Sequence, residues 1–77
     1  MEFEKIRDII SEQMGIDKNT ITAETTFRGD LNADSLDIFQ IISDLEEVFG
    51  LEFENEDMER ISTVGDAAEY VKKAINS

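Results

Sequence analysis

Apolar residues recur at steps of three and four positions in three parts of the chain, which is the spacing of one helical face. The first stripe is followed by Gly15 and the second by Gly50, and glycine commonly ends helices. The stripes are Phe3, Ile6, Ile9, Ile10 and Met14; Ile38, Ile41, Ile42, Leu45 and Phe49; and Val64, Ala67, Ala68, Val71 and Ile75. The pattern therefore predicts three main amphipathic helices.

Two of these helices have recognisable start signals. Asp34 is followed three residues later by Asp37, and Thr63 is followed at the same distance by Asp66. Each pair has the spacing of a capping box, in which two side chains satisfy the free backbone N–H groups of a helix start. We therefore expect the second helix to follow Asp34 and the last helix to follow Thr63.

The other segments lack helical periodicity. Residues 15–33 are rich in Asn, Thr, Gly and Asp, which predicts a long loop. Its apolar anchors are Ile16, Ile21, Phe27 and Leu31. Residues 51–55 are expected to form a connector, and residues 56–61 have the length of a short helical turn. No repeat or linker divides the chain, so we expect one domain over residues 1–77. The predicted fold class is all-α, a small bundle of three main helices plus one short helix.

The chain of 77 residues is strongly acidic, with 19 Asp plus Glu, seven Lys plus Arg and a formal charge of -12. Residues 30–59 hold eleven of the acids and no basic residue. Nucleic acid and anionic membranes are therefore poor partners, so we expect no nucleic acid to bind, and a basic protein surface is favoured. No apolar run approaches the roughly 20 residues of a membrane span, and the first residues lack the basic start of a signal peptide. We expect a cytoplasmic monomer without stable membrane insertion.

The chain contains neither Cys nor His. The lack of Cys removes disulfides, thiolate nucleophiles and Cys metal sites, and the lack of His removes the usual general base near neutral pH. The chain is therefore badly equipped for catalysis of its own, and we expect a protein that is not an enzyme and has no resident metal.

The second helix carries an acidic row on the side opposite its apolar stripe. At about 100° per residue, Asp37, Gln40, Asp44 and Glu47 share this side, and like charges one turn apart repel. Leu36 and Phe39 lie off the core stripe near the first turn. One interpretation is a solvated face, and the other is a docking site in which acids surround an apolar contact. The cost of the repulsion favours docking.

A calcium loop is a second candidate. Asp30, Asn32 and Asp34 reproduce the first three ligand positions of an EF-hand. The match then breaks, because Ser35 stands where the turn requires Gly and Ile41 stands where a bidentate Glu closes the shell. An acidic calcium-responsive or protein-binding module remains the alternative from a different functional class.

The third candidate is Ser35. A serine at a helix start is most often a cap or a tolerated residue. However, Asp34-Ser35-Leu36-Asp37, preceded by Asp30-Leu31-Asn32-Ala33 and followed by Leu45-Glu46-Glu47-Val48-Phe49, resembles the acyl carrier proteins of dissociated fatty acid synthesis. The resemblance covers nearly the whole chain and implies an acyl-carrier-like helical bundle. A specialised polyketide or peptidyl carrier is the alternative within the carriers.

The resemblance implies a carrier of acyl intermediates. Ser35 would bear 4'-phosphopantetheine through a phosphodiester, transferred from coenzyme A by a separate phosphopantetheinyl transferase. The thiol of that arm would hold acyl groups as thioesters. The implied partners are this transferase, acyl transferases, ketoacyl synthases, reductases and dehydratases with basic docking patches. The docking residues would be Asp34, Leu36, Asp37, Phe39, Gln40, Asp44, Glu46 and Glu47.

Members of the family can shelter the acyl chain between their helices. The candidate lining residues here are Phe27, Ile42, Leu45, Phe53, Ile61 and Ala67, each of which could equally be a plain core residue. The sequence departs from the common family pattern at Asn32, Gln40 and Ser43. Asn32 replaces a frequent Gly, which Asn can match because it tolerates positive φ. For Arg28, the sequence offers only an ion pair with Asp30.

Overall fold

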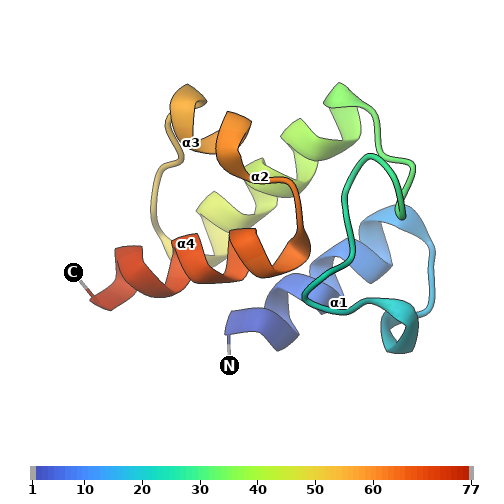
Figure 1. Ribbon diagram of the computed structural model, residues 1–77. Helices are drawn as coiled ribbons and strands as arrows, with labels where there is room; N and C mark the ends of the chain where they lie inside the picture. The colour runs from blue at the N-terminus through green and yellow to red at the C-terminus, as the bar shows by residue number, and fades with distance from the viewer. Residues whose placement is uncertain (1, 77) are drawn as a thin grey trace.

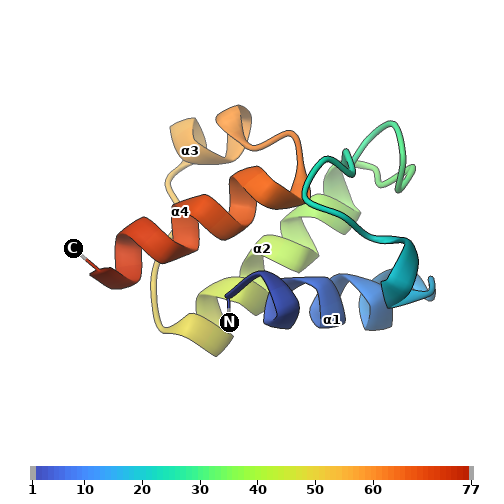
Figure 2. The ribbon, with the colours of Figure 1, turned by 60° about the horizontal axis from the view of Figure 1, so that its bottom comes forward.

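The computed structural model describes residues 2–76, which form four α-helices and one short 3-10 helix. The helices are α1 (Glu2–Met14), η1 (Lys18–Thr20), α2 (Ser35–Phe49), α3 (Asn55–Arg60) and α4 (Val64–Asn76). Helix α1 packs against both α4 and α2. Figures 1 and 2 show α4 lying between α1 and α3, with the long loop closing the end of the bundle beside the start of α2. The predicted all-α bundle of three main helices and one short helix is confirmed.

The helix boundaries follow the local signals in the sequence. Helix α1 ends before Gly15, which has φ 68°, and α2 ends before Gly50, which has φ 66° and lies in the left-handed region. Helix α3 begins one residue earlier than the predicted turn and also ends one residue earlier. The 3-10 helix η1 was not predicted, because it depends on a local cap, Asp17 Oδ1 accepting from Asn19 N at 2.9 Å, and not on apolar periodicity.

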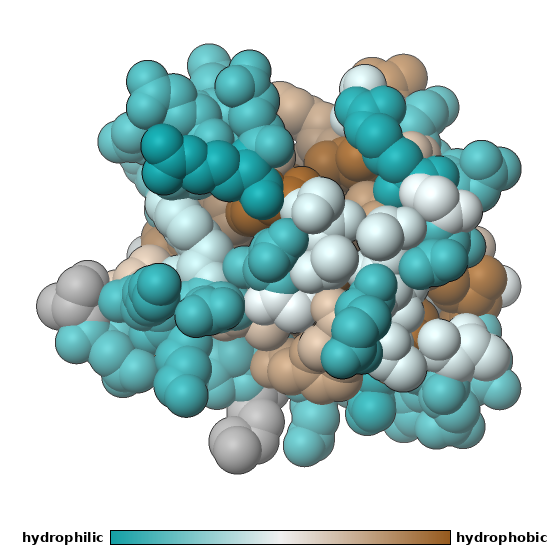
Figure 3. Space-filling model, viewed as in Figure 1, coloured by the Kyte–Doolittle hydropathy of each residue, from teal (hydrophilic) through white to brown (hydrophobic). Residues whose placement is uncertain are grey.

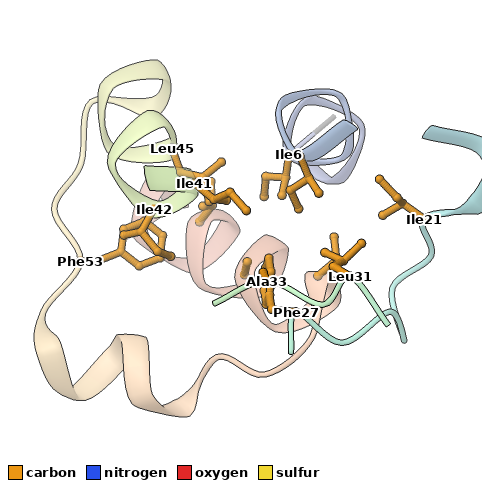
Figure 4. Packing of buried hydrophobic residues seen from close by; sticks show 13 residues of the cluster. Ile6, Ile21, Phe27, Leu31, Ala33, Ile41, Ile42, Leu45 and Phe53 are labelled. Atoms are coloured by element: carbon orange, nitrogen blue, oxygen red, sulfur yellow. The ribbon is translucent and has the colours of Figure 1, made fainter. Parts of the chain in front are cut away.

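The hydrophobic core draws on the loop as well as on the helices (Figure 4). Ile21, Phe27 and Leu31 are buried, as their role as anchors requires, and Ile16 is partly buried. The buried core residues are Ile6, Ile10, Ile21, Phe27, Leu31, Ala33, Ile41, Ile42, Leu45, Phe53, Val64, Ala67 and Val71. The loop is therefore an ordered part of the core, and its backbone can serve as a scaffold.

Backbone hydrogen bonds join the loop to the start of α4. Thr26 and Thr63 form an isolated antiparallel bridge, and Phe27 N donates to Ser62 O at 3.1 Å. On the other side, Val64 N donates to Thr25 O and Gly65 N to Ala23 O, both at 2.9 Å. These bonds satisfy donors that a helix start otherwise leaves free, so the loop and α4 hold one another in place.

The predicted cap of α4 is present. Asp66 Oδ2 accepts from the backbone N atoms of Ser62 and Thr63, both at 3.1 Å, and Asp66 N donates to Thr63 Oγ1 at 3.0 Å. The backbone bonds from Ser62 and Thr63 lower the pKa of Asp66 below its ordinary value. A carboxyl group whose pKa is lowered by folding stabilises the folded state at pH values above its unfolded pKa. This contribution is lost as the pH falls through its folded pKa.

In the part of the chain that the structure describes, none of the helices combines the length and the apolar character that a membrane span requires.

The contact between Gly65 and Ala23 gives a first prediction. A Cβ at position 65 would lie 2.8 Å from the backbone oxygen of Ala23, so Gly65→Ala must push the loop away from α4. We expect this variant to lower the free energy of unfolding by about 1–3 kcal/mol in urea titrations. Helix propensity alone predicts the opposite change, a free energy of unfolding that is about 1 kcal/mol higher.

The exposed Glu69→Ala on the same helix is the matched control, with an expected change within about 0.5 kcal/mol. A Gly65→Ala protein as stable as the wild type, or more stable, would show that the loop does not constrain α4.

Candidate functional site

Ser35 is the first residue of α2 and is exposed. The residue before it, Asp34, caps the helix, and its Oδ1 accepts from Asp37 N at 2.9 Å. Asp37 Oδ2 accepts in return from Asp34 N at 3.2 Å. This reciprocal capping box, predicted from the sequence, sets the residue at which the helix begins. The Ser35 hydroxyl is thereby presented at the surface on the first turn.

The loop before α2 is tied back on itself. Thr26 N donates to Asp30 Oδ2 at 3.0 Å, and Asp30 N donates to Thr26 Oγ1 at 2.9 Å. Ala33 N donates to Phe27 O at 2.8 Å. Between these bonds Asn32 has φ 54°, the one positive value at a non-glycine among residues 2–76. The expectation that Asn32 meets a backbone requirement for positive φ is confirmed.

Arg28 lies beside Ser35. Its Nη2 donates to Ser35 Oγ at 3.2 Å. The ion pair between Arg28 and Asp30 is not present, so that expectation was wrong: the two ion pairs within residues 2–76 are Arg7–Asp8 and Lys73–Glu69. Instead, Asp30 Oδ2 accepts the backbone N–H of Thr26, which holds this carboxylate against the backbone of the loop.

An open groove of about 770 Å³ lies next to Ser35, between the loop, the start of α2, α3 and the segment that follows α3. Figure 3 shows apolar surface in a hollow between a hydrophilic lobe, which corresponds in Figure 1 to α3, and a lobe of mixed character on the side where α2 begins. Ser35, Arg28 and Glu59 are polar residues at the groove. Its apolar side chains are Phe27, Ile38, Phe39, Met58 and Ile61. A chain attached at Ser35 would find an apolar surface directly alongside.

The six residues proposed for an acyl pocket fall into two groups. Phe27 and Ile61 line the groove. Ile42, Leu45, Phe53 and Ala67 are buried in the core and do not line it. Sequence reasoning missed Ile38, Phe39 and Met58 as lining residues. Ile38 stands one turn before Ile42, and Met58 stands three residues before Ile61, so helical spacing could have indicated both.

Helix α3 forms one wall of this groove and is held by few contacts. None of its residues is buried. Tyr70 on α4 donates its hydroxyl to Asp57 Oδ2 at 2.9 Å, and its ring stacks on Phe53 with centroids 4.4 Å apart. Partial burial and the hydrogen bond to Asp57 raise the pKa of Tyr70. The neutral phenol of Tyr70 therefore stabilises the folded state at pH values below its unfolded pKa. This contribution is lost as the pH rises through its folded pKa.

The proposed docking residues lie on α2 and at its cap, with unequal exposure. Leu36 is 79% exposed and Phe39 is 64% exposed, which confirms that both lie off the core stripe. Asp34, Gln40 and Glu47 are exposed, whereas Asp37, Asp44 and Glu46 are half-buried. Gln40 Nε2 donates to Asp44 Oδ1 at 3.2 Å. The helix thus presents two apolar side chains beside a row of polar and acidic ones.

Glu46 has a structural contact that the sequence did not reveal. Its Oε2 accepts from Phe53 N at 2.8 Å, and its backbone oxygen accepts from the N atoms of Gly50 and Leu51. Glu46 therefore fastens the connector between α2 and α3. Its role as a docking residue stays a prediction.

The candidate calcium ligands are engaged within the protein. Asp30 and Asp34 each accept a backbone N–H, as described above. Across the described residues, no three or more Asp or Glu side chains gather in an arrangement that could hold a metal ion.

Comparison with known proteins gives consistent matches. A family model described as the phosphopantetheine attachment site matches residues 4–71. An acyl carrier protein of Clostridium acetobutylicum is 50% identical over 72 residues, 94% of each chain. An acyl carrier protein of Lactobacillus johnsonii is 46% identical over 74 residues, which cover 96% of this chain and 92% of that protein.

Solved structures are similar over the same length. An acyl carrier protein from Enterococcus faecalis has a TM-score of 0.81 at 36% identity, covering 94% of this chain and 91% of that chain. A Mycobacterium tuberculosis protein described as an acyl carrier protein has a TM-score of 0.90 at 34% identity, covering 96% and 99%.

The contacts of Glu46 give a second prediction. We expect Glu46→Ala to lower the free energy of unfolding by about 1–2 kcal/mol, because the half-buried N–H of Phe53 loses a charged acceptor. The neighbouring Glu47→Ala is the matched control: this exposed carboxylate should change stability by less than about 0.5 kcal/mol. Equal urea midpoints for the two variants would contradict the structural role of Glu46.

Proposed function

Because this chain belongs to the acyl carrier protein family, we propose that Ser35 is the residue to which its 4'-phosphopantetheine is attached. Members of the family carry acyl groups as thioesters on this covalently bound group, usually in fatty acid synthesis. The observation that carries the assignment is the position of Ser35, exposed at the first residue of α2 and bordered by an apolar groove. The arm supplies the thiol that a chain without Cys lacks.

In this proposal the chain is the substrate of its own modification. The Ser35 oxygen forms a bond to the phosphorus of coenzyme A nearest the pantetheine, the pyrophosphate P–O bond breaks, and adenosine 3',5'-bisphosphate leaves. The hydroxyl proton needs a base. The guanidinium of Arg28, which is hydrogen-bonded to Ser35 Oγ, is a donor that has no acceptor, and the chain has no His. A phosphopantetheinyl transferase therefore supplies the base together with coenzyme A and Mg²⁺, and this chain acts as a carrier that is not an enzyme.

The groove beside Ser35 is the proposed shelter for the arm and its acyl chain. Each methylene moved out of water onto apolar side chains contributes about 0.8 kcal/mol. Phe27 and Ile61, with Ile38, Phe39 and Met58, offer the first such surface. The deeper candidates Ile42, Leu45, Phe53 and Ala67 become accessible only when α3 moves away from the bundle. The few contacts of α3 support such a movement.

The proposed docking face is α2 with its cap, presented to basic patches on phosphopantetheinyl transferase, acyl transferases, ketoacyl synthases, reductases and dehydratases. Exposed ion pairs contribute about 0.2–1 kcal/mol each, so several of them give recognition together with fast release. Leu36 and Phe39 add an apolar contact among the acids. We further propose that residues 1–77 act as a single-domain monomer in the cytoplasm.

The attachment site gives a third prediction. Incubation of the unmodified protein with coenzyme A, Mg²⁺ and a broad-specificity phosphopantetheinyl transferase should add one phosphopantetheinyl group, measured by intact mass. Ser35→Ala should gain nothing, and the matched control Ser43→Ala, an exposed serine on the same helix, should be modified like the wild type. Modification of Ser35→Ala, or no gain by a folded wild type while another carrier is converted in parallel, would overturn the assignment.

The docking face gives a fourth prediction. Reversing one charge with Glu47→Lys should raise the KM of a ketoacyl synthase for the acylated carrier about 2- to 10-fold at low salt, the size expected from one lost and one repulsive exposed pair. The effect should shrink with added salt. Glu69→Lys makes the same charge change on α4 and should leave KM within about 2-fold. Equal effects of the two variants would show that net charge, and not the α2 face, governs binding.

A further inference from the structure

The side chain of Arg28 has an unusual partner for a guanidinium in an acidic protein. Its Nη2 contacts a neutral hydroxyl, Ser35 Oγ, at 3.2 Å. Among residues 2–76, no carboxylate lies within 4 Å of it in an ion pair, although residues 30–59 carry eleven acids. A guanidinium has five N–H donors in a planar fork, and a single hydroxyl occupies one of them. The fork is therefore largely free to bind an anion.

The carboxylates close to Arg28 and Ser35 in the sequence already accept backbone hydrogen bonds. The carboxylate of Asp30 holds the backbone N–H of Thr26. The carboxylates of Asp34 and Asp37 hold one another's backbone N–H groups in the capping box. These bonds hold the three carboxylates against the backbone of the loop and of the start of α2, and none of the three forms an ion pair with Arg28. The local fold therefore keeps one cation unneutralised at Ser35.

We propose that Arg28 binds the phosphodiester formed at Ser35 and so positions the base of the arm. This inference rests on the proposed function, since it requires Ser35 to carry the arm. The phosphorus would be bonded to the same oxygen that Arg28 already contacts, which brings the two non-bridging oxygens that share the single negative charge within reach of the fork. Paired N–H donors match two oxygens of a phosphate, and such charge-assisted bonds are stronger than the bond to a hydroxyl.

The position of Arg28 also gives the arm a direction. Arg28 and Ser35 both line the groove, and the buried side chain of Phe27 forms part of its apolar lining. A phosphate held on the Arg28 side starts the arm along the apolar groove, whereas Asp34, adjacent to Ser35, repels the phosphate. Both Arg28 and Ser35 are exposed, so the contact is weak, reversible and screened by salt. An enzyme with a basic patch can therefore draw the arm away.

The test follows all three arginines of the chain, so that Arg7 and Arg60 serve as controls for Arg28. The protein labelled with ¹⁵N is converted to the phosphopantetheinylated form, and the mass gain is verified. The side-chain Nε–H cross-peaks of Arg7, Arg28 and Arg60 are then compared between the unmodified and modified proteins at pH 6. Only the Arg28 cross-peak should shift, and its exchange with water should slow at least about 2-fold. Addition of 0.5 M NaCl should return the peak toward its unmodified position, because the ion pair is screened.

Substitutions supply a second readout, the ³¹P resonance of the attached phosphodiester. At low salt, the ³¹P chemical shift of Arg28→Gln should equal the shift that the wild type shows at high salt. Arg28→Lys should fall between the two, since Lys keeps the charge and loses the fork. The matched control Arg60→Gln should behave like the wild type.

The two proposals fail in different ways. No mass gain in the wild type overturns both the attachment at Ser35 and the role of Arg28. A normal mass gain with an Arg28 cross-peak that moves no more than that of Arg60, or a ³¹P resonance that Arg28→Gln leaves unchanged, overturns the Arg28 inference alone.

Discussion

The capping box between Asp34 and Asp37 is the constraint on which the functional surface depends. The capping box fixes the residue at which α2 begins, while burial of the apolar stripe fixes the rotation of the helix about its axis. With Ile41 and Leu45 in the core, Leu36 and Phe39 face the solvent near the helix start. A cap of this kind contributes about 0.5–2 kcal/mol. Its larger effect here is positional, because it places Ser35 on the exposed first turn of the helix.

The long loop turns that helix start into a site. Its anchors Phe27 and Leu31 are core residues, and its backbone is joined to the beginning of α4 by the bridge between Thr26 and Thr63. A loop held in this way can support a groove on one side of Ser35 and place Arg28 against the hydroxyl. The other wall, α3, is held more loosely. A firm wall opposite a loosely held one suits a carrier that must both shelter and release its cargo.

Periodicity and capping signals predicted α1, α2 and α4 nearly to the residue, because both act over a few neighbouring positions. The contacts between segments were not predictable in this way. The bond from Phe53 N to Glu46 and the contact between Arg28 and Ser35 each join residues seven positions apart through the path of a loop. The acyl pocket shows the same limit: apolar character identified Phe27 and Ile61, but it could not separate groove residues from core residues such as Leu45.

The central claim is that the fold presents one serine, Ser35, for attachment of the arm. The most direct measurement is fragmentation mass spectrometry of peptides from the modified wild-type protein, which locates the added group among the serines at positions 11, 35, 43, 62 and 77. The account predicts the whole modification on Ser35, with the other four serines unmodified. The group found on Ser62, which also lines the groove, or on any other serine, would contradict it.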